Sequence, residues 1–283
     1  MKRQLTAVAA LCGALALGTT GTASAAGDPG RVETGTAYTD TLGGGQGLAA
    51  RADGSLLYRG LADIPLDLRI KGWNHVGDPD IARGHTFDAY QGPDTATSKM
   101  YAVTTPSGKR YEYVHQLNPG EKLNNSFATV SPDGQWLVSG EWGEQRRLQV
   151  FPAPLLNPAT PPTGGDLKEA WQITLDRPVR DIQGCDFVTD IRLLCASNDA
   201  TGTLFPELHP LLQVDLPRKV DGRPITATVK PLLALPRRSV CKGAFETEGI
   251  DYDVNTGTLR AQMIPPGVCA VATAVYSYRQ AAN

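Results

Sequence analysis

The sequence lacks the motifs that mark the common enzyme classes. No Gly-x-Ser-x-Gly elbow, His-Glu-x-x-His helix motif, P-loop or dinucleotide-binding fingerprint occurs in its 283 residues. Charge is also sparse: 20% of the residues are charged, and the net charge is only −2. Such a chain has little long-range attraction for phosphate backbones or anionic lipid. We therefore expect neither nucleic acid nor membrane among its partners.

Long apolar runs are missing, and only the first 25 residues differ in composition from the rest. Lys2 and Arg3 form a basic start, residues 5–17 are rich in Ala and Leu, and residues 23–25 resemble a small-residue cleavage site. This pattern predicts a secretory signal peptide over residues 1–25, because the apolar run is too short to span a bilayer. The remaining residues, 26–283, are expected to form one secreted, extracellular, monomeric domain.

Cysteine is scarce, and the first of the five cysteines would leave with the signal peptide. The other four are Cys185, Cys195, Cys241 and Cys269. An even number in an oxidising compartment predicts two disulfides. A hairpin that turns midway between Cys185 and Cys195 would place the two opposite each other, within disulfide range. Cys241 would then pair with Cys269. A zinc site is disfavoured because no Cys-x-x-Cys pair occurs.

Helical periodicity is almost absent after the signal peptide. Short alternating segments rich in Val, Leu, Tyr and Phe are broken by Gly, Pro, Asp and Asn, which is typical of β-strands and tight turns. One unit of strand, turn and strand recurs, and further strand pairs lie between its copies. The five copies are at residues 48–58, 80–90, 127–138, 185–195 and 250–261.

This repeat predicts an all-β fold, a β-propeller with five four-stranded blades of roughly 50 residues each. Six blades and a β-sandwich are the alternatives. The first unit is short. Residues 31–39 could pair with residues 271–278, which would close the ring and cover two strand edges. The Pro-rich segment 151–165 is interpreted as a loop within blade three rather than a linker.

Three motifs carry a resemblance to known proteins. Ser-Pro-Asp-Gly at 131–134 resembles the hairpin of bacterial propeller repeats. His-Val-Gly-Asp-Pro-Asp at 75–80 and Glu-Gly-Ile-Asp at 248–251 are similar to blade openings in secreted propellers of the YVTN and NHL kind. The resemblance implies a fold and no particular chemistry, because propellers host many activities.

Polar residues precede the innermost strand of most predicted blades, and in a propeller these positions ring the mouth of the central channel. Their carboxylate and amide oxygens suit Ca²⁺. Asp78, Asn125 and Glu248 are the first candidate ligands, with Asp80, Gln183 and Asp251 as further ones. His75 is the candidate catalytic base or transition-metal ligand. The full set is His75, Asp78 and Asp80 in blade two, Asn124 and Asn125 in blade three, Gln183 and Asp186 in blade four, and Glu246, Glu248 and Asp251 in blade five.

Two classes of function fit this pattern. The first is an extracellular binding or interaction scaffold for a protein, a polymer or a small ligand, favoured by the lack of a compact catalytic motif. The second is a calcium-dependent hydrolase of lactones or phosphate esters, in which a channel-mouth cation polarises the substrate. Propeller enzymes of that kind are similar in drawing an acid and amides from separate blades. Hydrogen-bonded lining of a wet channel is the simplest alternative to both.

Overall fold

Five inner strands, one from each blade, contact one another in a closed ring. The computed structural model describes residues 30–124 and 126–281, so the predicted signal peptide lies outside the described residues. Each inner strand contacts the next, and the last contacts the first, which confirms the predicted five-bladed β-propeller. In ring order the inner strands are β2 (Gly47–Ala50), β5 (Asp80–Ala82), β9 (Thr129–Val130), β14 (Ile182–Thr189) and β18 (Glu246–Asp253).

Four blades are four-stranded antiparallel sheets, as predicted. In blade two, β5 and the short β4 (His75–Val76) both pair with β6 (His85–Gln91), followed by β7 (Ser98–Thr104) and β8 (Arg110–Gln116). Blade three continues from β9 through β10 (Trp136–Ser139), β11 (Glu144–Pro152) and β13 (Trp171–Arg180). Blade four adds β15 (Arg192–Ser197), β16 (Pro210–Asp215) and β17 (Ile225–Ala234) to β14. Blade five adds β19 (Thr258–Ile264), β20 (Ala272–Gln280) and β1 (Arg31–Asp40) to β18.

Blade one departs from the prediction of four strands. It has only β2 and β3 (Leu56–Arg59), and then the chain turns into η1 (Leu61–Asp63) and α2 (Leu66–Ile70). Ile64 and Leu68 are buried in a cluster with Val76 of blade two. The apolar residues after β3 therefore cover the neighbouring blade instead of extending their own.

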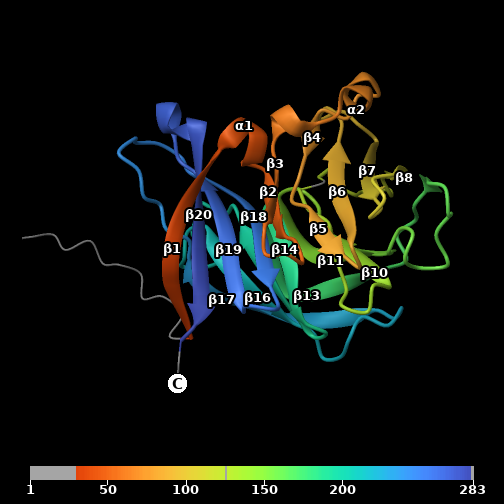
Figure 1. The fold of residues 1–283 in the computed structure, drawn as a ribbon. Coiled ribbons are helices and arrows are strands. Elements are labelled where there is room, and N and C mark those ends of the chain that lie inside the picture. The colour runs from red at the N-terminus through yellow and green to blue at the C-terminus, as the bar shows by residue number, and fades with distance from the viewer. Residues whose placement is uncertain (1–29, 125, 282–283) are drawn as a thin grey trace, which may run out of the picture.

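The first and last described strands close the ring, as the sequence predicts. β1 pairs antiparallel with β20, with Tyr38 opposite Ala274, and the two lie side by side in Figure 1. The chain then leaves β1 through α1 (Thr41–Gly44), whose first turn is capped by the Asp40 carboxylate. Blade five is thus built from both ends of the described chain.

Blades three and four join at their outer strands, because β13 and β17 pair in parallel with Ile173 opposite Ile225. The segment 151–165 is a connection within blade three, as expected, and its end forms β12 (Gly165–Asp166), which pairs with β8 of blade two. The β5–β6 hairpin turns at Arg83 and Gly84, both with positive φ (53° and 73°), the geometry of a two-residue type I′ turn.

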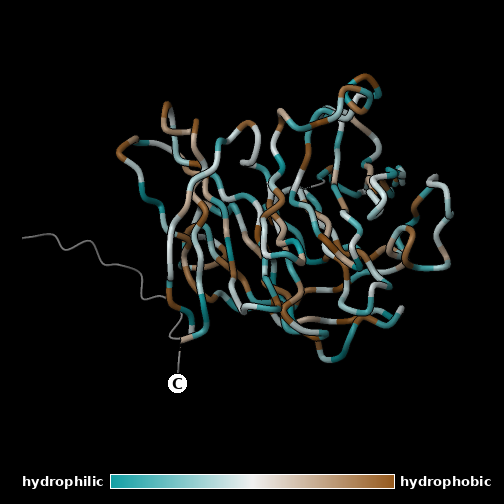
Figure 2. The backbone as a smooth tube through the Cα atoms, viewed as in Figure 1, coloured by the Kyte–Doolittle hydropathy of each residue, from teal (hydrophilic) through white to brown (hydrophobic). Residues whose placement is uncertain are grey.

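The hydrophobic core lies between the blades rather than at the axis. Apolar stretches run along the strands (Figure 2), and the three largest clusters join blades three to four, four to five, and two to three. Both predicted disulfides are confirmed. Cys185 pairs with Cys195 across the β14–β15 ladder, and Cys241 pairs with Cys269 in η2 (Gly267–Val271). No helix among the described residues is long and apolar enough to cross a membrane.

Candidate functional site

Asp78 closes the central channel between two cavities. Its side chain is only 1% exposed. One carboxylate oxygen accepts the backbone N–H of Leu48 at 2.9 Å, and the other accepts that of Ile250 at 3.0 Å. Burial raises the pKa of Asp78 well above its usual value, although the two backbone donors oppose the shift. One side chain from blade two therefore links the inner strands of blades one and five.

Glycines from three blades leave room for this carboxylate. A Cβ atom built on Gly47, Gly184 or Gly249 would lie 2.7, 2.4 or 2.1 Å from an oxygen of Asp78. Real Cβ atoms do not approach so closely, so only glycine fits at these three positions while Asp78 stays in place.

This position corrects one prediction for Asp78. The sequence places Asp78 at a channel mouth, but the structure places it between the cavities, where it lines neither of them. Its oxygens bond to backbone donors because the glycines let the chain close around it. Asn125 lies outside the described residues. The other predicted residues divide between two opposite mouths rather than meeting at one.

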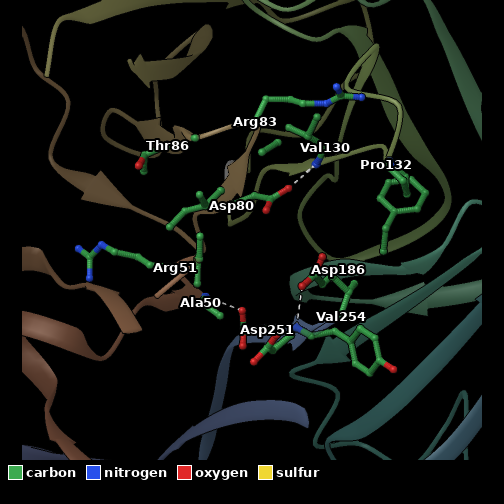
Figure 3. A pocket seen from close by; sticks show the side chains of 18 of the residues that line it. Ala50, Arg51, Asp80, Arg83, Thr86, Val130, Pro132, Asp186, Asp251 and Val254 are labelled. Carbon is green, nitrogen blue, oxygen red and sulfur yellow. Dashed lines mark hydrogen bonds between the residues drawn. The ribbon is translucent and has the colours of Figure 1, made fainter. Parts of the chain in front are cut away.

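The first cavity, which we call the acidic mouth, is built around Asp80, Asp186 and Asp251 (Figure 3). Asp80 lies two residues after Asp78. Asp186 and Asp251 lie two residues after Gly184 and Gly249, two of the glycines that leave room for Asp78. Alternate residues of a strand share one face, so all three carboxylates lie on the axial face of their strands. Each accepts a backbone N–H from the inner strand of the next blade: Asp80 from Val130, Asp186 from Tyr252 and Asp251 from Ala50, all at 2.6 Å.

Equivalent positions in the other two blades carry no charge. In blade five, Asp251 directly precedes Tyr252, whose backbone N–H is a donor. The corresponding donors are Val130 in blade three and Ala50 in blade one, and the residues that precede them are Thr129 and Ala49. The ring at this level therefore contains three aspartates, one threonine and one alanine, so its charge comes from blades two, four and five.

The acidic mouth encloses a cavity of about 590 Å³, within the range of small-molecule sites. Arg260 pairs with Asp251 at 2.7 Å, but neither Asp80 nor Asp186 has a Lys or Arg salt-bridge partner in the described part of the chain. Arg51 and Arg83 also line the cavity, and Figure 3 shows their side chains extending away from the three carboxylates. The mouth therefore carries more acid than its own basic groups neutralise.

Burial and mutual repulsion make these carboxyls hard to ionise. Burial raises the pKa of Asp80 to about 6, and the nearby Asp251 carboxylate adds to the shift. For Asp186, burial and then the charges of Asp80 and Asp251 raise the pKa well above its usual value. Burial also raises the pKa of Asp251, partly offset by the Ala50 N–H and Arg260. A bound positive charge would relieve this repulsion.

The second cavity, which we call the opposite mouth, lies on the other side of Asp78 and has a volume of about 540 Å³. Burial lowers the pKa of His75 and raises that of Glu248 well above its usual value, so each neutral form is favoured. Trp142, half exposed, also lines this cavity. The structure brings five of the predicted site residues together here: His75, Asn124, Gln183, Glu246 and Glu248.

Neither mouth has the compact ligand set of a preformed metal site. Among the described residues, one group of three His, Cys, Asp or Glu side chains has ligand atoms within 4.8 Å of one another: His115, Glu121 and Glu169. That group lies in an interior ion-pair network. Nζ of Lys99 is 3.2 Å from Oε1 of Glu121, and Nε2 of His115 is 2.9 Å from Oε2 of Glu121. The Lys99 ammonium is therefore a buried cation that is already present at this group.

Sequence reasoning missed the division into two mouths and the role of Trp142. The period-two alternation of the inner strands could have shown that residues 78 and 80, and likewise 249 and 251, share one face at different depths. Trp142 lies in the loop between β10 and β11, and no motif in the sequence marks it.

Comparisons with known proteins add a likeness of overall shape. No family model and no curated protein matches the chain. Among solved structures, the chain is similar to the native arabinanase Arb43A of Bacillus subtilis, with 10% sequence identity and a TM-score of 0.41, over 88% of this chain and 92% of that one.

Proposed function

We propose that the protein is an extracellular binding propeller whose acidic mouth takes a small cationic ligand. The observation that supports this most directly is the convergence of Asp80, Asp186 and Asp251 on one cavity with a single arginine partner among them. Carboxylates held by backbone N–H groups are already oriented before any ligand arrives. A ligand with positive charge would stabilise their ionised forms, so its binding would be coupled to the release of protons from these carboxyls.

An organic ammonium group suits this cavity better than a bare ion. The three carboxylates do not form a triplet with ligand oxygens within 4.8 Å of one another among the described residues, so Ca²⁺ would contact only one or two of them and complete its shell with water. A primary ammonium has three N–H donors, and a polyamine carries several such groups that can reach separate carboxylates. Ca²⁺, the ion expected from the sequence, remains the comparison ligand.

Calorimetric titration with spermidine, CaCl₂ and choline tests this proposal. Choline carries charge without N–H donors, so we expect it to bind more weakly than spermidine. Asp186→Asn should weaken spermidine binding about tenfold or more by removing one unpaired carboxylate. Asp190→Asn is the matched control, because Asp190 is exposed in the turn of the same hairpin. Failure of every cation to bind, or equal binding to both variants, would contradict the proposal.

A hydrolase is the second candidate, favoured by the pKa of Asp80, which burial raises to about 6, near the range where proton-transfer groups work best. A cation in the acidic mouth would polarise a lactone or phosphate ester, and Asp80 would take a proton from the attacking water. His75 would have no part, because Asp78 separates it from this cavity. Hydrolysis of simple lactones and aryl phosphates, assayed with and without CaCl₂, should disappear in Asp80→Asn. Activity that survives this substitution would exclude the mechanism.

A further inference from the structure

The opposite mouth holds buried polar atoms that the protein itself does not satisfy. Within the described residues, Nδ2 of Asn124 and Nδ1 of His75 have no hydrogen-bond partner. Asn124 is only 4% exposed, and both residues line the cavity of about 540 Å³. Buried donors left unpaired are costly, and native proteins retain them mainly where water or a ligand completes the bonding.

The Asn124 amide is fixed at one end by a hydrogen bond. The hydroxyl of Ser126 donates to its Oδ1 at 2.6 Å, so the acceptor end is occupied and the NH₂ group is the free end. Gln183 and Glu248 are 7% and 5% exposed and line the same space. Glu248 accepts one hydrogen bond, from Gln46 at 3.3 Å. The floor of the cavity therefore combines amide donors and acceptors with a carboxyl group.

Trp142 provides a flat apolar surface on a fixed loop. Its neighbours on both sides are anchored: the N–H of Glu141 donates to the Gln145 side chain at 3.0 Å, and the N–H of Gly143 donates to Asp181 at 2.7 Å. The indole is nevertheless half exposed. A large aromatic side chain left half exposed beside a polar cavity is typical of binding sites in which one face of a ligand stacks on the ring.

The charges around the cavity disfavour a strongly charged ligand. Asp94 and Lys122 line the cavity with opposite charges, the ammonium of Lys122 donates to the carbonyl of Glu144 at 2.9 Å, and burial favours the neutral forms of Glu246 and Glu248. A cation would not satisfy the free NH₂ group of Asn124, which needs an acceptor. Hydroxyl groups can both donate to the carboxyls and accept from the amides.

We infer that the opposite mouth binds a neutral polyhydroxylated ring, the chemistry of a monosaccharide unit, with one face on Trp142 and hydroxyls bonded to Asn124 and Gln183. This site is separate from the acidic mouth, because Asp78 lies between them, and it does not depend on the function proposed there.

Titration of ¹⁵N-labelled protein with neutral aldopentoses, aldohexoses and myo-inositol, followed by the tryptophan indole signals, tests the inference. The indole signal that is missing in Trp142→Phe should move saturably with at least one of these sugars at millimolar concentration. Trp142→Ala and Gln183→Ala should each weaken binding by about fivefold or more. Tyr38→Ala is the aromatic control, because Tyr38 is exposed on the outer strand of blade five, and it should bind like the parent protein.

Trp142→Phe keeps an aromatic face and should retain most of the affinity, so the test stands even if Trp142→Ala fails to fold. The inference is overturned if no sugar of the panel moves the Trp142 signal, or if Gln183→Ala binds as tightly as the parent protein. It is also overturned if spermidine or CaCl₂ shifts that signal more than any sugar does, since the site would then bind cations.

Discussion

Gly249 and Asp78 lie so close together that a Cβ atom on residue 249 would be 2.1 Å from Oδ1 of Asp78. The two residues come from blades five and two, which are not neighbours in the ring. Their contact therefore holds the ring across its axis, whereas the blade-to-blade cores hold it around its circumference. It also separates the two cavities, so either mouth can be altered without direct contact with the other.

The axial contact predicts a large effect of one methyl group. Gly249→Ala should lower the free energy of unfolding by about 3 kcal/mol, because Asp78 must move and its hydrogen bonds to Leu48 and Ile250 weaken. Urea denaturation measures the change. Gly35→Ala is the matched control, since a Cβ there would meet nothing within 4 Å. Equal stability of the two variants would show that the axis tolerates displacement of Asp78.

Removal of the Asp78 carboxylate should also destabilise the ring. In Asp78→Ala, the backbone N–H groups of Leu48 and Ile250 lose their acceptor in a buried site, at a cost of about 2–5 kcal/mol in total. Asp78→Asn keeps one acceptor oxygen and should lie between Ala and the parent protein in thermal melts. An Asn variant less stable than the Ala variant would argue against this hydrogen-bonding account.

The acidic mouth predicts a specific pH dependence of stability. Burial raises the pKa of Asp80 from 3.8 to about 6, so the folded protein keeps a proton that the unfolded chain has released between these values. The stability contributed by this group is therefore greatest at low pH and is lost as the pH rises through that window. Asp80→Asn should flatten this part of the curve of melting temperature against pH.

A cation in the acidic mouth should reverse this loss. Protons compete with the ligand for the carboxylates, so the rise in melting temperature caused by spermidine should be larger at about pH 7.5 than at about pH 5. A rise that is independent of pH would show that spermidine binds elsewhere.

The buried ion pair of Lys99 and Glu121 predicts a contrast with a surface pair. Neither side chain is exposed, and their charges are 3.2 Å apart. Burial alone would raise the pKa of Glu121, but the hydrogen bond from His115 and the charge of Lys99 lower it to about 2. Lys99→Met should cost about 3–5 kcal/mol, because it leaves a buried carboxylate without its cation.

Lys71→Met is the control for that substitution. Lys71 and Glu112 are 2.7 Å apart, but the Lys71 side chain is about half exposed, so the loss should be below about 1 kcal/mol. Urea denaturation of both variants makes the comparison. Similar losses would indicate that the interior network contributes no more than a surface pair does.

The Cys241–Cys269 disulfide, 28 positions apart, followed only by elimination, but local patterns in the sequence were sufficient for most strands and turns and for the Cys185–Cys195 disulfide. Cys185 and Cys195 pair because they are symmetric about one tight turn, and Gly84 readily adopts the positive φ that the β5–β6 turn requires. These features depend on residues within about ten positions of one another. Blade one was predicted less well, because the chain after β3 forms η1 and α2, and Leu68 of α2 is buried in a cluster with Val76 of the next blade. The finer likeness to YVTN and NHL propellers remains a prediction from the motifs.

The candidate sites show where reasoning from the sequence reached its limit. The sequence by itself determined that carboxylates and amides recur at the start of the inner strands, and this alone indicated that they would gather at the axis. Only the tertiary structure decided how deep in the central channel each of these side chains lies. Strand alternation sends Asp78 and Asp80 to the same face, but the glycines of other blades allow Asp78 to close the channel, while Asp80 opens onto the acidic mouth. That choice depends on contacts between residues up to 172 positions apart, which no local pattern encodes.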